Sequence, residues 1–218
     1  MSATDGTTNA ANNGASGVEQ ALIAVYADES CLGNGREGDN PGGAAGLIEC
    51  VRLGSGQLAR FDYWVSDPAT TNNRMALRSV IEAFRILGVK GKRQRVVFTS
   101  DSNYIVKGMS EWLPGWIARG WARKGGAIEN LELWREAADA VRPHDVQWVW
   151  VRGHDGHAQN EYANDLAIRA ARELTSSPGA VASGFDAWLA AKTAKGKVRA
   201  PTPFPPAAFR AARAIPRG

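Results

Sequence analysis

The order of apolar and polar positions predicts strands first and then alternating helices and strands. An almost unbroken apolar run, ALIAVYAD (residues 21–28), is typical of a central strand that is covered on both faces. Two further strand patterns follow glycine-rich turns, AAGLIECV (44–51) and ARFDYWVS (59–66). Because short turns connect antiparallel neighbours, these three segments predict a meander.

Helical spacing begins in the segment 70–88, TTNNRMALRSVIEAFRILG. Polar residues supply the cap, Leu77, Ile81 and Phe84 supply a buried stripe, and Gly88 supplies the stop. Strands are then predicted at 95–101 and 145–153, and helices at 102–112, 130–141 and 160–175. The order β-β-β-α-β-α-α-β-α predicts an α/β fold, with three antiparallel strands and two parallel strands in a five-stranded mixed sheet flanked by helices.

Composition divides the chain into three parts. Residues 1–18 are rich in small polar residues and lack periodicity, so we expect a disordered tail. Residues 19–175 form the predicted domain. Residues 176–218 form a tail rich in Pro and Ala, with a short helix expected after Gly184 and an extended end. This tail holds seven Lys or Arg and one Asp, so its charge is about +6. Because the net charge of the whole chain is +4, the rest of the chain has a charge near −2. Such a tail suits salt-sensitive contact with phosphates, or remains a solvated segment.

Charge, hydropathy and cysteine content exclude some protein classes. The charged fraction of 22% and hydrophobic fraction of 44% are those of a soluble globular protein. Two cysteines are too few for a disulfide framework, and no apolar run is long enough to span a bilayer. We therefore expect a cytoplasmic protein without membrane contact. A monomer is the default, and no protein partner can be deduced.

Candidate chemistry lies where two predicted strands end. Asp28 ends the first strand and Asp101 ends the strand that follows the first helix. If these strands are parallel neighbours, both carboxylates project into the crevice beyond the carboxyl ends of the strands. Two close carboxylates repel, so either one takes a proton or a cation lies between them. A hard divalent ion, Mg²⁺ or Mn²⁺, suits oxygen ligands. Either Asp taken alone is as well explained as a turn or capping residue.

Four segments resemble the bacterial type 1 ribonucleases H. They are YADESCLGN, TTNNRMALRS, TSDSNYIVKGMSEW and VRGHDGHAQNEYANDLA, and the likeness runs in order from about residue 23 to 175. The resemblance implies a ribonuclease H-like fold and hydrolysis of the RNA strand of RNA–DNA hybrids with two metal ions, Mg²⁺ or Mn²⁺. It also implies roles for individual residues. Asp28 and Asp101 match the family's first and third metal carboxylates, Asn164 stands at its fourth ligand position, and His154 matches a mobile histidine that assists catalysis.

Nucleic-acid contacts are implied by the same resemblance. The positions that match hybrid-contacting residues are Cys31, Asn34, Thr71, Asn72, Asn73 and Asn103. Trp112, Trp116 and Trp121 match aromatic residues of the basic handle that grips the DNA strand, and Arg119, Arg123 and Lys124 keep some of its charge. Packing within a helical hairpin would explain the three tryptophans equally well.

Three positions depart from the family pattern. Ala76 stands where the family has a Glu ligand, Asn164 where it has an Asp, and Glu29 where it has a Gly. Asn164 keeps an oxygen that can bind a metal ion, whereas Ala76 leaves space that water could fill. Such a site would be about two charges weaker, which predicts weaker Mg²⁺ binding, a preference for Mn²⁺ or low turnover. Whether Ala76 and Asn164 are natural or engineered is open.

Glu29 is a candidate to replace the missing carboxylate. Alternation along a strand sends the side chains of Asp28 and Glu29 to opposite faces, which argues against it unless the strand has already ended. Asp165 and Glu82 lie on the wrong faces of their helices. His157 is best read as a structural hydrogen-bonding residue.

The function that we predict is metal-dependent cleavage of RNA in RNA–DNA hybrids, with activity reduced by Ala76 and Asn164. Two alternatives stay open. One is a hybrid-binding module that has lost catalysis, which would bind hybrids without cleaving them. The other is a nuclease of the same fold that acts on DNA, which a comparison of hybrid and duplex DNA cleavage would separate.

Overall fold

The computed structural model describes residues 21–33, 40–52, 54–206 and 208–216. The predicted N-terminal tail (1–18) and Asn34 therefore lie outside the described residues. Among the residues described, no helix is long and apolar enough to cross a membrane.

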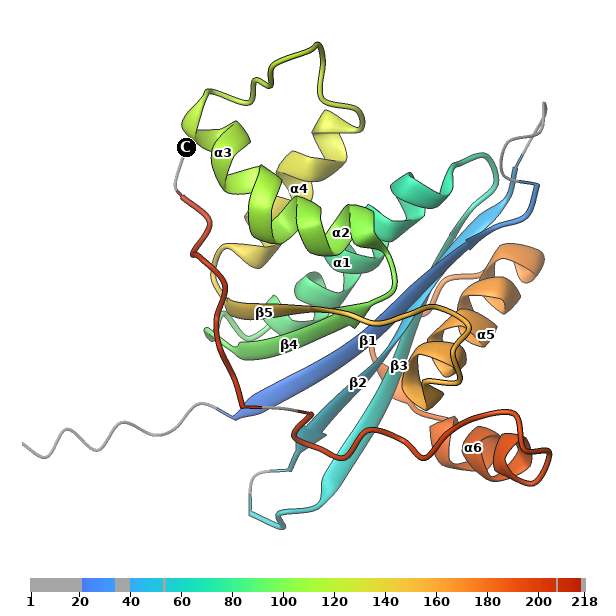
Figure 1. Cartoon of the computed structure of the whole chain (residues 1–218). Helices are drawn as coiled ribbons and strands as arrows, with labels where there is room; N and C mark the ends of the chain where they lie inside the picture. Colours follow the sequence, from blue (N-terminus) through green and yellow to red (C-terminus); the bar gives the residue numbers. More distant parts are fainter. Residues whose placement is uncertain (1–20, 34–39, 53, 207, 217–218) are drawn as a thin grey trace, which may run out of the picture.

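One mixed sheet forms the centre of the molecule (Figure 1). Its strands, in the spatial order β5-β4-β1-β2-β3-β6, are β1 (Leu22–Cys31), β2 (Gly42–Val51), β3 (Leu58–Asp67), β4 (Arg95–Ser100), β5 (Asp145–Trp150) and β6 (Val181–Ala182). Strands β1, β2 and β3 pair antiparallel, and β4 and β5 continue the sheet in parallel from β1. The predicted mixed sheet is confirmed. It has six strands rather than five, because two residues of the C-terminal region pair with β3, a stretch too short to give a periodic pattern.

Helices cover both faces of the sheet. Helix α1 (Asn72–Gly88) packs on one face with α4 (Leu131–Val141) against it, and α5 (Ala158–Glu173) packs on the other. Between β4 and α4 the chain forms α2 (Asn103–Lys107), the π-helix η1 (Gly108–Trp112) and α3 (Leu113–Ala118), and α6 (Phe185–Thr193) follows β6. Helix α1 begins where its sequence predicts, since the Thr71 hydroxyl accepts a hydrogen bond from the backbone N–H of Arg74.

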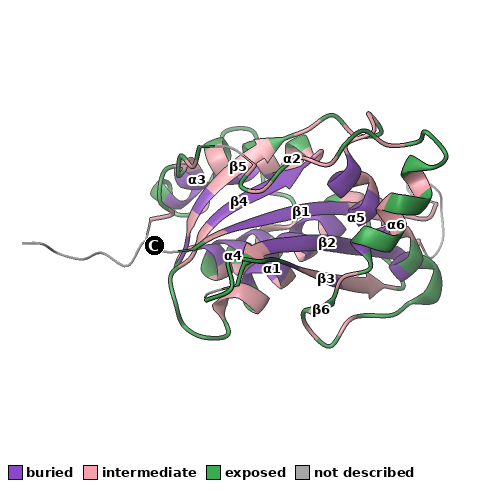
Figure 2. Ribbon diagram, turned by 90° about the horizontal axis from the view of Figure 1, so that it is seen from below, coloured by how far each residue is buried: buried purple, intermediate pink, exposed green. Residues whose placement is uncertain are grey.

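Side-chain alternation in β1 divides the core into two clusters. Ile23, Val25 and Ala27 face the cluster beneath α1, while Ala24 and Tyr26 face the cluster beneath α5. Figure 2 shows that β1, β2 and β4 are buried along most of their length. The even-numbered residues of β1 therefore point to α5 and the odd-numbered residues to α1.

Candidate active site

Carboxylates gather where β1 and β4 separate. The parallel pairing of these strands ends at Ala27 and Ser100, so Asp28 and Asp101 stand next to each other at the carboxyl ends of neighbouring strands. Oxygen atoms of Asp28, Glu29 and Asp101 all lie within 4.8 Å of one another. Three carboxylates, rather than the two foreseen from the sequence, thus form one acidic group.

Strand alternation predicted that the side chain of Glu29 would lie away from that of Asp28. The Glu29 side chain leaves β1 on the α1 face, as alternation requires, because Ala27 two residues earlier faces the α1 cluster. However, the site lies beyond the end of the β1–β4 pairing, so on this side of β1 no paired strand separates the two faces, although β2 still pairs on the other side. Carboxylates from both faces can therefore meet there. The expectation that alternation carries Glu29 away from Asp28 is wrong.

Asp28 is held by two hydrogen bonds. Its Oδ1 accepts the backbone N–H of Glu29 at 2.7 Å, and its Oδ2 accepts the side-chain N–H of Asn160 on α5 at 3.1 Å. Both Asp28 and Asn160 are almost fully buried. These bonds fix the carboxylate against β1 and α5 and leave its charge without a basic partner among these contacts.

Burial raises the pKa of each carboxyl in the acidic group, and repulsion within the group adds to the shift of Asp28 and Glu29. Desolvation by burial, followed by the charge of Asp101, raises the pKa of Asp28 to about 9 and that of Glu29 to about 8. Burial also raises the pKa of Asp101, against lowering effects from hydrogen bonds of its own backbone and of the Asn160 side chain and, less strongly, from the charge of His154. Three carboxyls that resist ionisation together are a donor set suited to a hard divalent cation, whose charge offsets the repulsion.

Ala76, on α1, is packed into the hydrophobic core. Its side chain is 1% exposed and belongs to the hydrophobic cluster between α1 and the sheet. The open, water-filled space that the sequence suggested at this position is therefore not present. The carboxylate on this face of the sheet comes from β1 instead of from α1.

The loop between β5 and α5 approaches Asp101 closely. A Cβ atom at Gly153 would lie 2.2 Å from Asp101 Oδ2, so any other residue here would displace that carboxylate or the loop. His154 follows in the left-handed region with φ 53° and is exposed. Asn164, half-buried on α5, lies one helical turn after Asn160 and so shares its face of the helix.

The residues proposed to contact the hybrid lie at the start of α1 and beside it. The Cys31 thiol donates to the backbone carbonyl of Thr70 at 3.4 Å, which joins the end of β1 to the start of α1. Thr71 caps the helix, and Asn73 is exposed beside it. Asn72 Oδ1 is buried and has no hydrogen-bond partner among the described residues. Asn103 is exposed at the first turn of α2.

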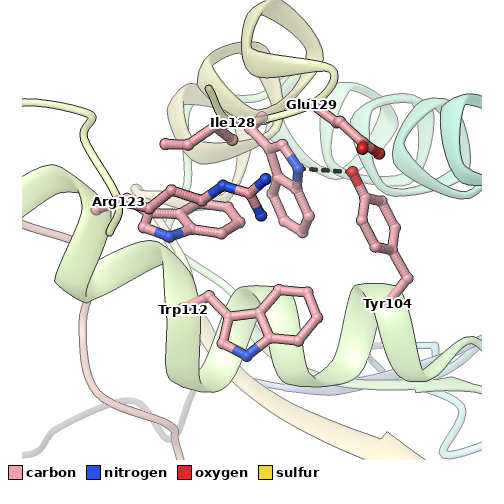
Figure 3. A pocket seen from close by; sticks show the side chains of 7 residues that line it. Tyr104, Trp112, Arg123, Ile128 and Glu129 are labelled. Atoms are coloured by element: carbon pink, nitrogen blue, oxygen red, sulfur yellow. Dashed lines mark hydrogen bonds between the residues drawn. The ribbon is translucent and has the colours of Figure 1, made fainter. Parts of the chain in front are cut away.

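Aromatic side chains line a pocket of about 300 Å³ between α2, η1, α3 and α4 (Figure 3). The Trp134 indole N–H donates to the Tyr104 hydroxyl at 2.8 Å and fixes the floor of this pocket. Trp112 is 37% exposed, whereas Trp116 is 8% exposed and packs edge-on against Trp134. Arg123 reaches over the pocket mouth, so an aromatic and cationic surface is available there.

Trp121 has a different environment from the other two tryptophans. Its φ is 63°, its backbone N–H donates to the Trp116 carbonyl at 2.7 Å, and the Arg135 guanidinium lies 5.5 Å from its ring centroid. Its ring therefore carries a cation on one face, which fixes its orientation.

Comparisons with known proteins decide the family. The RNase H family profile matches residues 20–172, which includes every element from β1 to the last turn of α5. The chain belongs to the ribonuclease H family. Ribonuclease H of Aromatoleum aromaticum is 41% identical over 73% of this chain and 97% of its own length. Ribonuclease H of Cupriavidus necator is 42% identical over 70% of this chain and 97% of its own length.

Solved structures agree with this family and extend the likeness into the C-terminal region. LC9-RNase H1, described as a type 1 RNase H with the type 2 active-site motif, is 61% identical, with a TM-score of 0.83 over 91% of this chain and 95% of its own. The RNase H domain of PFV shares the fold, with a TM-score of 0.57 at 17% identity. The ribonuclease H-like fold expected from the sequence is confirmed.

Three residues of the site were missed or set aside by sequence reasoning. Glu29 was set aside on alternation alone. Asn160 was not among the predicted site residues, because its bond to Asp28 depends on how α5 packs on β1. Gly153 gave a signal, a glycine directly before the proposed catalytic histidine, but its contact with Asp101 required the structure.

Proposed function

We propose that this protein cleaves the RNA strand of RNA–DNA hybrids with divalent metal ions held by Asp28, Glu29, Asp101 and Asn164. The observation that carries the proposal is the three-carboxylate group at the ends of β1 and β4. This group has one more negative charge than the sequence led us to expect. It therefore offsets part of the loss of acidic ligands at Ala76 and Asn164, which was the main argument against catalysis. Compared with four acidic ligands, the proposed set is one charge weaker rather than two.

The residues of the site fit a pair of metal ions. Mg²⁺ and Mn²⁺ prefer carboxylate and amide oxygens, and three carboxyls with raised pKa values provide an acidic group whose repulsion a cation relieves. When bound, two divalent ions stabilise the attacking and leaving oxygens of an in-line displacement at phosphorus. Asn164 contributes an oxygen without charge.

Other residues of the chain position the reacting groups. Asn160 holds Asp28 through its side-chain N–H, and Gly153 lets the β5–α5 loop lie against Asp101. His154, exposed on that loop beside Asp101, can hold or transfer a proton at the scissile phosphate.

Recognition of the hybrid is assigned to two surfaces. In this proposal the polar residues near the start of α1 and of α2, together with Cys31, contact the sugar-phosphate backbone and the 2′-hydroxyls of the RNA. Trp112, with Arg123 at the pocket mouth, presents an exposed ring and a cation to the DNA strand. Trp116 and Trp121 support that surface by packing.

LC9-RNase H1 gives independent support, since it is a type 1 RNase H with the type 2 active-site motif and is 61% identical to this chain. A relative in which the type 1 fold carries another active-site motif makes an exchange of ligand positions credible here. The exchange that we propose is Glu29 on β1 in place of a carboxylate at Ala76 on α1.

The test is cleavage of an end-labelled RNA–DNA hybrid with Mg²⁺ and Mn²⁺ titrated separately, beside duplex DNA of the same sequence. We expect cleavage of the RNA strand, no cleavage of duplex DNA, and loss of cleavage in Asp101→Asn. Hybrid binding without cleavage in either metal would show a binding module instead. Cleavage of duplex DNA would show a DNA-directed nuclease.

A further inference from the structure

The C-terminal strap, which we define as residues 199–206 and 208–216, crosses the α5 face of the sheet after α6 (red in Figure 1). Phe204 packs against the hydrophobic cluster beneath α5. The ring of Phe209 lies 4.8 Å from the Arg95 guanidinium at the start of β4, and the Ala212 backbone N–H donates to the Val146 carbonyl of β5 at 2.7 Å. The contacts of Phe209 and Ala212 form the far end of the strap, which is held at the amino ends of β4 and β5.

The near end of the strap binds the loop that carries His154. The backbone N–H of Arg199 donates to the Gly156 carbonyl at 2.9 Å, and its guanidinium donates to Asp155 Oδ1 at 2.9 Å. His154 and Gly156 both have positive φ, 53° and 76°. A non-glycine residue keeps this conformation when its surroundings hold it there, and Arg199 contacts the two residues that follow His154.

Thr202 binds the first turn of α5. Its backbone N–H donates to Gln159 Oε1 at 3.1 Å, and its carbonyl accepts from Gln159 Nε2 at 2.7 Å. The Thr202 hydroxyl also lies 3.1 Å from His157 Nε2. Gln159 is fully buried, and this pairing provides partners for its amide oxygen and its amide nitrogen.

His157 connects the strap to the acidic group. It is the N-cap of α5, and its Nδ1 accepts the backbone N–H of Asn160 at 3.3 Å, so Nε2 carries the ring proton and donates to the Thr202 hydroxyl. Asn160 in turn donates to Asp28. A continuous set of hydrogen bonds thus runs from Thr202 through His157 and Asn160 to Asp28.

We propose that the near end of the strap is a positioning element for cleavage, in which Arg199 and Thr202 hold the His154 loop and the first turn of α5 in place against the acidic group. The inference rests on the proposed ribonuclease H function and adds residues that lie outside the matched family region of 20–172. The far end of the strap covers the sheet and its β5 edge, which contributes to stability rather than to the geometry of the site.

The test compares Thr202→Val, which removes the hydroxyl and keeps the shape, with the far-end control Phe209→Ala. In single-turnover and steady-state cleavage of a hybrid, we expect Thr202→Val to lower kcat about tenfold while KM changes less than about twofold. Thr202→Ser should restore kcat. Phe209→Ala should lower the melting temperature and leave kcat at the wild-type value.

A second readout separates this inference from the proposed function. Amide hydrogen exchange of residues 153–160 should accelerate about tenfold in Thr202→Val and stay at the wild-type rate in Phe209→Ala. If the wild-type protein cleaves no hybrid, the proposed function fails, and the exchange measurement still tests the contact. The inference is overturned if Thr202→Val leaves exchange and kcat unchanged, or if Phe209→Ala produces the same changes as Thr202→Val.

Discussion

Helices α1 and α5 pack on opposite faces of the same strand but relate to the acidic group in different ways. Helix α5 binds Asp28 through Asn160, and its first turn is held by the C-terminal strap. Helix α1 presents Ala76 to the hydrophobic core, and Glu29 of β1 provides the carboxylate on that side. In the proposed site a carboxylate ligand has moved from a helix to a strand, which is possible at the end of a sheet because side chains from both faces meet there.

The largest effect is expected from Glu29→Gln, which removes the charge on the α1 side and keeps the side-chain size. Removal of a residue that hydrogen-bonds to a metal ligand typically lowers metal affinity or activity about 10- to 100-fold. Loss of the charge of a ligand itself should therefore lower kcat by at least about 100-fold. Steady-state cleavage of a hybrid measures this, and hybrid affinity should change little. Glu82→Gln, on the outer side of α1, is the matched control and should keep wild-type activity. Equal activity of both variants would contradict the role of Glu29.

An exchange between the two positions sharpens the comparison further. Ala76→Glu alone places a carboxyl in a buried apolar site and should lower the free energy of unfolding by about 1–3 kcal/mol without raising kcat. The double variant with Ala76→Glu and Glu29→Gly should cleave at least about tenfold faster than Glu29→Gly alone. Denaturant unfolding and hybrid cleavage measure the two effects. Ala76→Gln serves as the uncharged control, which should not recover activity.

On the α5 side, Gly153→Ala tests the close approach of the β5–α5 loop to Asp101. The added methyl group would overlap Asp101 Oδ2, so the carboxylate or the loop must move. A displacement of about 1 Å at a catalytic group can lower kcat about 10- to 100-fold. Gly88→Ala, whose methyl would meet only ordinary contacts, is the control. If Gly153→Ala cleaves as fast as the wild type, the loop does not constrain Asp101.

The smallest effect is a pH dependence of stability from the α5 cap. Burial lowers the pKa of His157, so between that pKa and about 6.5 the folded state binds fewer protons than the unfolded state. The contribution of His157 to stability is therefore complete above about pH 6.5 and is lost as the pH falls through this window. His157→Asn keeps a capping side chain and cannot titrate. The difference in melting temperature between wild type and His157→Asn should shrink or reverse as pH falls from 7 to 5.

The fold could be predicted from the sequence where periodicity was strong. The apolar run of β1, the capped stripe of α1 and the order of strands and helices gave the mixed sheet and the place of Asp28 and Asp101. Strand β6 could not be predicted, because two residues carry no period. The π-helix η1 inside the predicted helix 102–112 was also invisible, since it changes hydrogen bonding rather than the apolar pattern.

The site was less predictable than the fold because it depends on where pairing stops. Alternation gave the correct face for Glu29, but the conclusion also required knowing that β1 and β4 separate after Ala27. The strap shows the same limit. Residues 199–216 have the composition of an extended tail, yet backbone and side-chain hydrogen bonds of Arg199 and Thr202 attach it to the site. Contacts of this kind leave no periodic pattern of apolar and polar residues in the sequence.

The central claim is that Glu29 replaces a helix carboxylate as a metal ligand, and calorimetric titration of Mn²⁺ into wild type and Glu29→Gln tests it most directly. The account predicts Mn²⁺ binding to the wild type, and affinity at least about tenfold weaker in Glu29→Gln. Binding to Glu29→Gln with the affinity and stoichiometry of the wild type would contradict it.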